Sequence, residues 1–401
     1  MWRIRSIVLI MICLLLPGCT QSTGNDLADE VFDTDDMLPR YDSQSKFCLP
    51  VSCLVETEQA YYGRVMGTHF LNYYDKESGE TGILCGRLDC SHDDLECNGY
   101  VGWGAIGLSV YDEKIYWTMK DPQEKNTIDH YLWRMNLDGT DRERLQEVRV
   151  PELNTNVIIQ IHRGYIYTAG TALKVVEGRP EEHIQVYAEK MEEEGSFVSI
   201  LDIVYDSPMP YCNIKLLGNS LYIMISHYKD EGNYSLALYE WNIQSRQMIT
   251  LMEEEGIAVE PWSFSVTAER ELYWIGWDPK DSMPAQVYRY NPETKEGEFC
   301  FDMESMDYLS GQLGDGVIAS VSYEENDAWL RIKDMEGNTL YDQQITFPGQ
   351  RKDISYMYTF YGGDQEYVYY EAMERSEEIE YPEVHMIRIP IAEQKEGEFL
   401  W

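Results

Sequence analysis

Three cysteines and a histidine lie close together early in the chain. Cys85, Cys90, His92 and Cys97 form the pattern C-x4-C-x-H-x4-C. Three thiolates and one imidazole make a complete tetrahedral set of zinc ligands. However, the pattern lacks the C-x2-C spacing common in zinc sites, and neighbouring thiols of an exported protein readily oxidise. The sequence therefore favours a disulfide between two of these cysteines, with zinc as the alternative and no other cofactor.

Cys19 is a candidate for lipid attachment. The chain begins with a short basic segment, continues with an apolar stretch over residues 6–16 and reaches Cys19 three residues later. This organisation is typical of a secretory signal, whose apolar stretch is too short for a stable membrane span. Leu16, Gly18 and Cys19 resemble the lipobox of bacterial lipoproteins, in which the cysteine is acylated and becomes the first residue of the mature chain. Pro17 departs from the small residue usual at that position.

The resemblance implies three parts of the chain. Residues 1–18 would be a lipoprotein signal peptide, and the lipid on Cys19 would hold the protein on the extracytoplasmic face of the cell membrane. Residues 19–45 are polar and acidic, so we expect an acidic, flexible tether. Residues 46–401 would be the folded domain. The net charge of −39 opposes contact with nucleic acid or with an anionic membrane surface, so the lipid would be the only contact with the membrane.

Two sequence signatures recur along the folded domain. The first is an apolar and aromatic strand core after a small turn, and its six copies from Tyr116 to Tyr369 repeat about every 51 residues. The second is a strand that enters a tight polar turn and leaves again. Seven such turns occur, near Gly79, Gly139, Gly195, Asn242, Asn291, Gly337 and Gly397.

These signatures predict the fold class. A period near 50 residues matches one four-stranded propeller blade, and long stretches with helical spacing of apolar residues are absent. We therefore predict an all-β fold, a seven-bladed β-propeller of four-stranded antiparallel blades over residues 46–401. Six or eight blades are the alternatives, because the first blade lacks an obvious innermost strand and would have to borrow residues 51–55.

The recurring turns also carry a resemblance to known propellers. Their pattern, an aromatic residue followed by Asn or Asp and then Gly, resembles that of WD-repeat and TolB-like propellers. Residues 70–101 resemble the opening of a group of lipid-anchored propeller lipoproteins of Firmicutes, related to the low-density lipoprotein receptor-related protein 1-like β-propeller family. The group has no assigned activity, so the resemblance implies a fold and a lipid anchor but no function.

One face of such a ring is expected to bind a ligand. The loops between the second and third strands open on the same face as the connections between blades, and these are the long loops of this chain, residues 170–182 among them. Tyr228, Tyr234, Trp277 and Tyr381 lie in or beside them and could stack on a sugar or peptide, with Asp278 as a hydrogen-bond acceptor. We therefore expect a glycan, peptide or protein ligand.

Short catalytic motifs are missing from the sequence. It contains no HExxH, no G-x-S-x-G and no P-loop, and the G-x-G-x-x-G at Gly102, Gly104 and Gly107 precedes a predicted strand where a dinucleotide site needs a helix. We therefore expect a protein that is not an enzyme, a binding or scaffold module. The alternative is an extracytoplasmic carbohydrate-active hydrolase or lyase that uses carboxylates lining the central channel.

Overall fold

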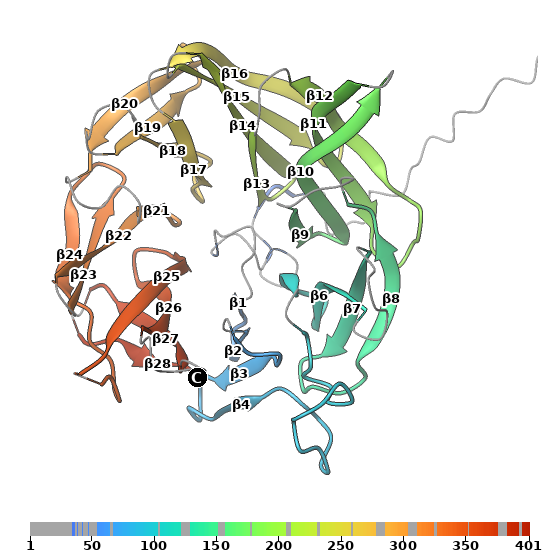
Figure 1. The fold of residues 1–401 in the computed structure, drawn as a ribbon, viewed down its shortest axis with the longest axis vertical. Helices are drawn as coiled ribbons and strands as arrows, with labels where there is room; N and C mark the ends of the chain where they lie inside the picture. The colour runs from blue at the N-terminus through green and yellow to red at the C-terminus, as the bar shows by residue number, and fades with distance from the viewer. Residues whose placement is uncertain are drawn as a thin grey trace, which may run out of the picture.

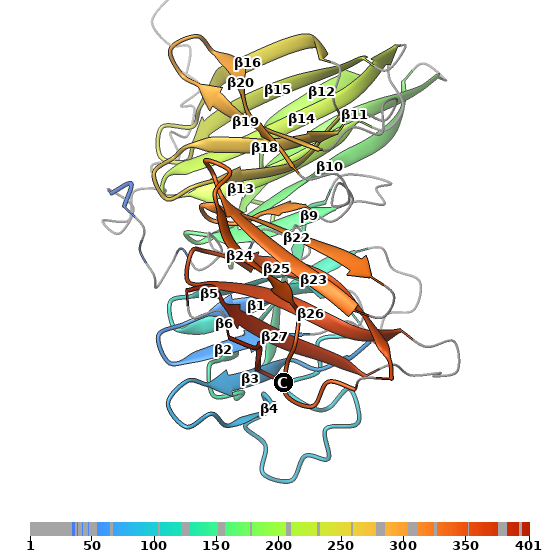
Figure 2. The ribbon, with the colours of Figure 1, turned by 90° about the vertical axis from the view of Figure 1, so that its left-hand side faces the viewer.

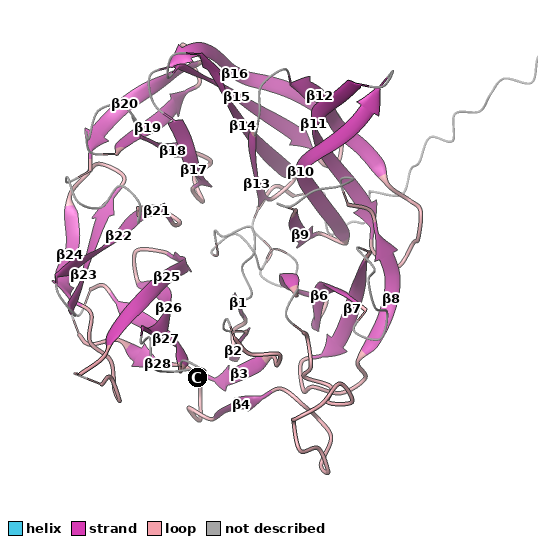
Figure 3. Ribbon diagram, in the orientation of Figure 1, coloured by secondary structure: helices cyan, strands magenta, loops and turns pink. Residues whose placement is uncertain are grey.

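A computed structural model describes most of the chain from Leu54 onward. Its gaps there are residues 65–66, 103–104, 122–128, 151–156, 177–178, 206–209, 231–232, 258–259, 278–284, 304–310, 325–326, 352, 376–382 and 393–394. Before Leu54 it describes only Thr34, Asp35, Asp36, Leu38, Asp42 and Phe47. The described residues form a ring of sheets around a central axis (Figure 1) and contain strands but no helix (Figure 3). None of them therefore belongs to a helix able to cross a membrane.

The ring consists of seven sheets of four antiparallel strands, each built from four consecutive strands. Blade 1, from the innermost strand outward, consists of β1 (Leu54–Glu56), β2 (Ala60–Gly63), β3 (Asn72–Asp75) and β4 (Thr81–Ile83), and blade 2 of β5 (Ile106–Tyr111), β6 (Lys114–Lys120), β7 (His130–Asn136) and β8 (Glu143–Val148). Blade 3 consists of β9 (Ile158–His162), β10 (Tyr165–Val176), β11 (Arg179–Lys190) and β12 (Val198–Tyr205). Blade 4 consists of β13 (Tyr211–Leu217), β14 (Ser220–Asp230), β15 (Asn233–Asn242) and β16 (Gln247–Ile257).

Blades 5 to 7 continue the same pattern to the end of the chain. Blade 5 consists of β17 (Glu260–Val266), β18 (Leu272–Trp277), β19 (Gln286–Asn291) and β20 (Glu296–Asp302). Blade 6 consists of β21 (Gln312–Leu313), β22 (Val317–Glu324), β23 (Asp327–Asp334) and β24 (Thr339–Gln344). Blade 7 consists of β25 (Ser355–Gly363), β26 (Tyr367–Arg375), β27 (Val384–Pro390) and β28 (Glu398–Phe399). The predicted seven-bladed propeller is confirmed. Its first blade takes its innermost strand from Leu54–Glu56.

The repeated signatures correspond to fixed places in the blades. The aromatic strand cores are the second strands, and the seven polar turns join the third strand of each blade to the fourth. Both faces of a blade pack against neighbours, so apolar side chains on the two faces of each strand are buried. Seven clusters of buried apolar residues result among the described residues, one between each pair of adjacent blades.

Blades 1 and 7 meet at a seam that no shared strand crosses. The ring of Tyr369 lies 5.3 Å from that of Phe47 and 5.7 Å from that of Tyr61, measured between centroids. The hydroxyl groups of Tyr61 and Tyr369 are 3.1 Å apart, and Arg388 donates to the Tyr61 hydroxyl at 3.0 Å. Phe47 also forms an isolated β-bridge with Gly362 of β25. Side-chain packing and this one backbone bridge therefore close the ring among the described residues.

Described residues of the segment expected to be a tether lie against the ring. Arg163, in the turn between β9 and β10, is fully buried and donates to both carboxylate oxygens of Asp42, at 2.8 and 2.7 Å. The same guanidinium donates to the carbonyl oxygens of Thr34 and Asp36, each at 2.8 Å, and to Asn219 Oδ1 at 2.7 Å. Every N–H group of Arg163 therefore has an acceptor, and the buried charge is paired.

The same segment also contacts blades 4 and 5. Asn219, between β13 and β14, donates its backbone N–H to the Asp35 carboxylate at 3.2 Å, and Arg270, between β17 and β18, donates to the Asp35 carbonyl at 3.0 Å. A Cβ atom on Gly218 would lie 2.3 Å from that carbonyl oxygen, so the contact requires glycine. We call Thr34–Asp36, Leu38 and Asp42 the brace, and contacts of Thr34, Asp35, Asp36 and Asp42 dock it on the turns of blades 3 to 5.

Candidate functional site

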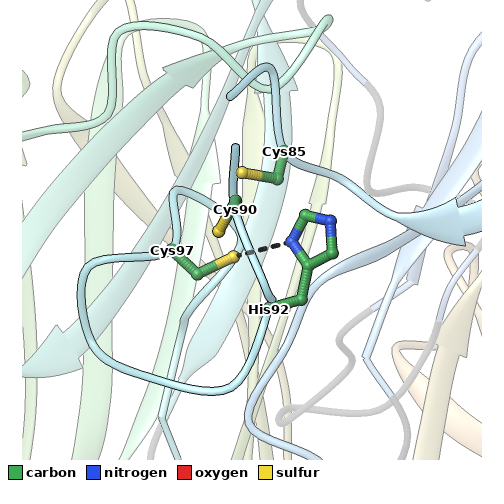
Figure 4. Close-up of side chains that lie close together, drawn as sticks. All are labelled: Cys85, Cys90, His92 and Cys97. Carbon is green, nitrogen blue, oxygen red and sulfur yellow. Dashed lines mark hydrogen bonds between the residues drawn. The ribbon is translucent and has the colours of Figure 1, made fainter. Parts of the chain in front are cut away.

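The Cys85, Cys90, His92 and Cys97 side chains come together in the connection between blades 1 and 2. Each offers one ligand atom, and these four atoms all lie within 4.8 Å of one another. Figure 4 shows the three sulfur atoms and the His92 ring facing a common centre. The shortest contact that includes the imidazole joins His92 Nδ1 to Cys97 Sγ at 3.4 Å. We call this group the Cys3His cluster.

Local backbone geometry and blade 2 hold the cluster in shape. His92 adopts a left-handed backbone conformation, with φ at 57°, which turns the short loop back on itself. Arg142 donates to the carbonyl oxygens of Leu95 and Cys97, at 3.1 and 2.9 Å, and its guanidinium lies 4.8 Å from the centre of the Trp133 ring. The connection between blades 1 and 2 is therefore fastened to blade 2.

The turn between β7 and β8 makes a second attachment to the cluster. Gly139 has a φ of 79°, and a Cβ atom there would lie 2.8 Å from the backbone of Cys85. Its carbonyl oxygen accepts hydrogen bonds from the Gly86 backbone N–H at 2.9 Å and from Asn98 Nδ2 at 2.8 Å. One of the seven predicted turns thus supports the loop that carries the ligands.

The sulfur atoms of the cluster are in different environments. No disulfide joins Cys85, Cys90 and Cys97, which differs from the pairing that we expected. Burial raises the pKa of the Cys97 thiol to about 12. Burial also opposes ionisation of Cys85, but hydrogen bonds from the backbone N–H groups of Arg87 and Asn98 and from the other two cysteines outweigh it and lower its pKa.

The residues predicted to bind a ligand are only partly brought together. Tyr228 and Tyr234 are opposite each other on β14 and β15, with ring centroids 5.6 Å apart in a T-shaped arrangement. Tyr228 is 41% exposed and Tyr234 8%, so only the first offers its ring to solvent. Strand alternation places Trp277 on the face of blade 5 that is turned to blade 6, away from that pair. Asp278, Tyr381 and Cys19 lie outside the described residues.

A raised hairpin in blade 3 was missed by our sequence interpretation. We assigned residues 170–182 to a long loop, but β10 and β11 each run for 12 residues and pair without interruption from Tyr165–Lys190 to Val176–Arg179. The available signals were Lys174 between Leu173 and Val175, and the β-branched pair Val175 and Val176. Figure 2 shows the ends of β11 and β12 and the long strands of blade 4 projecting from the ring on one side.

The raised strands carry exposed apolar side chains, with Val175 reaching 72% exposure. We call the exposed part of these strands the raised wall. Leu173 and Val175 of β10 lie on its face turned to blade 4, and the other exposed apolar side chains lie on other faces, Val176 and Val204 toward blade 2 and Tyr228 of blade 4 toward blade 5. Between blades 3 and 4, the Tyr205 ring contacts the His227 ring at 4.8 Å, and Ser235 hydrogen-bonds to His227. Burial lowers the pKa of His227, which favours its neutral form.

Comparison with known proteins supports the β-propeller fold but does not assign the chain to a family. No protein-family model matches the chain, and no curated protein matches its sequence. Among solved structures, a prolyl endopeptidase is similar at 13% identity and a TM-score of 0.56, with 89% of this chain and 50% of that chain covered. The chain thus spans about half the length of that peptidase. The Firmicutes-type family assignment that residues 70–101 suggested is not shown by these comparisons.

Two lyases are similar along nearly their whole length. An ulvan lyase of a polysaccharide lyase family matches at 12% identity and a TM-score of 0.54, with 89% of this chain and 96% of that chain covered. An oligogalacturonate lyase in complex with manganese matches at 13% identity and a TM-score of 0.50, with coverages of 89% and 91%. At such identities the likeness shows the β-propeller fold alone.

Our expectation that the protein is not an enzyme, which we drew from the absence of short catalytic motifs, is wrong. The similar solved structures include a prolyl endopeptidase and two lyases, so the β-propeller fold that this chain shares with them also occurs in enzymes. In a propeller, side chains from different blades can meet at one site without any fixed spacing in the sequence, so missing motifs do not argue against catalysis. The absence of short catalytic motifs therefore leaves an enzymatic role open.

Proposed function

We propose that the protein is a lipid-anchored extracytoplasmic lipoprotein whose propeller recognises a glycan, peptide or protein through the raised wall. The observation that carries this proposal is the set of exposed apolar side chains on long, regularly paired strands of blades 3 and 4. Exposed apolar residues on rigid strands lose little conformational entropy when they are covered, so they suit binding. The resemblance of residues 70–101 to lipid-anchored propellers of Firmicutes agrees with this proposal.

The position of the brace supports an outward orientation of the raised wall. The brace docks on turns between the first and second strands of blades 3 to 5, and in an antiparallel blade these turns lie opposite the hairpins between the second and third strands. Cys19 precedes Thr34 by 15 residues, which span at most about 50 Å. A lipid on Cys19 would therefore hold the brace side toward the membrane and leave the raised wall facing away.

The negative charge of the protein limits the kinds of ligand that the raised wall can bind. Acidic side chains border the raised wall, since Glu182 pairs with Leu173 and Glu255 with Ser235. Together with the net charge of −39, these carboxylates favour an uncharged or basic ligand and repel nucleic acid and anionic lipid. The membrane contact in this proposal is the lipid alone.

The recognition proposal predicts a loss of binding from two substitutions on β10. In the variant with Leu173→Ser and Val175→Ser, affinity for a ligand found with glycan and peptide arrays should fall about 10- to 100-fold, because two apolar contacts are removed. The control is Ile249→Ser, which alters an apolar side chain of intermediate exposure, between those of Leu173 and Val175, on the outer strand β16. Equal affinities for the two variants would exclude the raised wall as the binding surface.

The anchor proposal predicts that Cys19→Ser releases the protein from membranes. Without the acylated thiol nothing hydrophobic remains to hold a strongly anionic domain to an anionic bilayer. The measurement is the share of protein that sediments with membranes, and Cys300→Ser, which changes a partly buried cysteine of blade 5, is the control. Continued sedimentation of the Cys19→Ser variant would contradict the anchor.

A carbohydrate-active hydrolase or lyase is the second candidate function. The observation in its favour is that the match covers 96% and 91% of the two lyases but only half of the prolyl endopeptidase. The purified protein would be incubated with neutral and uronate-containing polysaccharides, and shortened or unsaturated products would be measured. Turnover that survives substitution of the raised wall would favour this candidate over the first.

A further inference from the structure

We propose that Cys85, Cys90, His92 and Cys97 bind one zinc ion in a closed structural site that locks the connection between blades 1 and 2. The chemical argument is the ligand set: three sulfur donors and one imidazole nitrogen satisfy all four positions of tetrahedral zinc. No position remains for water, so the ion would serve stability and would not act as a catalyst. The proposal is independent of the recognition function above.

The distances agree with a tetrahedral ion. Zinc lies about 2.3 Å from sulfur and about 2.0 Å from imidazole nitrogen, so these two ligand atoms are about 3.5 Å apart at a tetrahedral angle. The His92 Nδ1 to Cys97 Sγ distance is 3.4 Å. All four ligand atoms fall within 4.8 Å of one another, whereas a disulfide would bring two sulfur atoms to about 2.05 Å and leave the other two ligands unused.

The surroundings suit a metal-bound thiolate cluster. The backbone N–H groups of Arg87 and Asn98 donate to Cys85 sulfur, and that of Gly99 donates to Cys97 sulfur. Such donors orient thiolate ligands and disperse their charge. The guanidinium of Arg142, held by its bonds to the Leu95 and Cys97 carbonyls, places a positive charge beside the cluster.

Binding of zinc to the Cys3His cluster balances in charge and in protons. One Zn²⁺ replaces the protons of three thiols and coordinates a neutral imidazole, so three protons are released and the bound site carries one net negative charge. Arg142 offsets that charge across a short distance. No oxidant is needed, and the bound thiolates are withheld from the disulfide exchange that an exported chain meets.

The site would add a metal crosslink to the connection between two blades that backbone hydrogen bonds and side chains already join. The ligands lie between β4 of blade 1 and β5 of blade 2, and the turn at Gly139 and the Arg142 side chain attach them to the outer hairpin of blade 2. Loss of the ion should therefore loosen the loop and its attachment while the remaining blades stay folded.

The experiment measures metal and thiols in the full chain, isolated without added metal. We expect one zinc per chain by elemental analysis and, after exchange with cobalt, the visible absorption of a tetrahedral cobalt site with thiolate ligands. Peptide mapping without reduction should find Cys85, Cys90 and Cys97 unpaired. Neither the cobalt spectrum nor the mapping depends on a variant that might misfold.

Matched variants assign the ligands. Cys90→Ser and His92→Ala should each lower zinc affinity by more than about 100-fold, since losing even an outer partner of a metal ligand costs 10- to 100-fold. Cys300→Ser, far along the sequence in blade 5, should leave zinc content unchanged. A disulfide between two of the three cysteines, zinc content well below one per chain, or a Cys90→Ser protein that binds zinc as tightly as the parent would each overturn the proposal.

Discussion

Asp42→Ala is expected to lower the free energy of unfolding by about 3–5 kcal/mol, because it leaves the fully buried Arg163 guanidinium without its carboxylate partner. The substitution removes hydrogen bonds at 2.8 and 2.7 Å and the acceptor that fixes Leu38 to Asp42. A buried charge without a partner is among the few causes of such large losses. Chemical denaturation followed by tryptophan fluorescence measures the change.

Two further variants separate the charge effect from a general effect of the brace. Asp35→Ala removes an exposed carboxylate of the same segment and should cost less than about 1 kcal/mol. Combining Asp42→Ala with Arg163→Met removes both charges and should recover part of the lost stability. If Asp35→Ala and Asp42→Ala cost the same, the buried pair does not fasten the brace.

Tyr369→Ala is expected to cost about 3–5 kcal/mol and to open the seam between blades 1 and 7. The side chain is fully buried, packs on Phe47 and Tyr61 and hydrogen-bonds to the Tyr61 hydroxyl. Removing a large buried ring leaves a cavity that the surroundings fill only partly. Hydrogen exchange should accelerate most in β1, β2 and β25–β27.

The matched control for the seam is Tyr167→Ala. Tyr167 is equally buried, but it lies in the apolar cluster between blades 3 and 4, which the chain connects directly. We expect a similar loss of stability with faster exchange in β9–β16 and an unchanged seam. Faster exchange spread evenly over all blades in the Tyr369→Ala variant would show that the seam is not a weak point of the ring.

The fold was predictable because each blade repeats local signals. The seven polar turns, such as those at Gly79 and Gly337, sit between third and fourth strands, and the aromatic cores are second strands. The spacing of Cys85, Cys90, His92 and Cys97 likewise identified a cluster that lies within one loop. Patterns contained in a short segment are visible in a sequence because neighbouring residues alone produce them.

Features made by residues far apart in the sequence were not predictable. The Asp42–Arg163 pair joins positions 121 apart, and nothing in an acidic segment indicates which carboxylate is buried. We assigned the raised hairpin to a loop, whereas pairing of β11 with β12 and packing of blade 3 against blade 4 extend its strands. Trp277 was grouped with Tyr228 because the face of each blade depends on strand register, which a single sequence does not reveal.

Building each blade from consecutive strands has a consequence for how the chain matures. A polypeptide that emerges N-terminus first during synthesis can complete one sheet before the next emerges, since no blade waits for a strand from the far end. Only the junction of Phe47 and Tyr61 with Tyr369 and Leu400 depends on the last residues to arrive. Assembly would thus be sequential for six interfaces and delayed for the seventh, and this late step is where quality-control proteases would encounter an open ring.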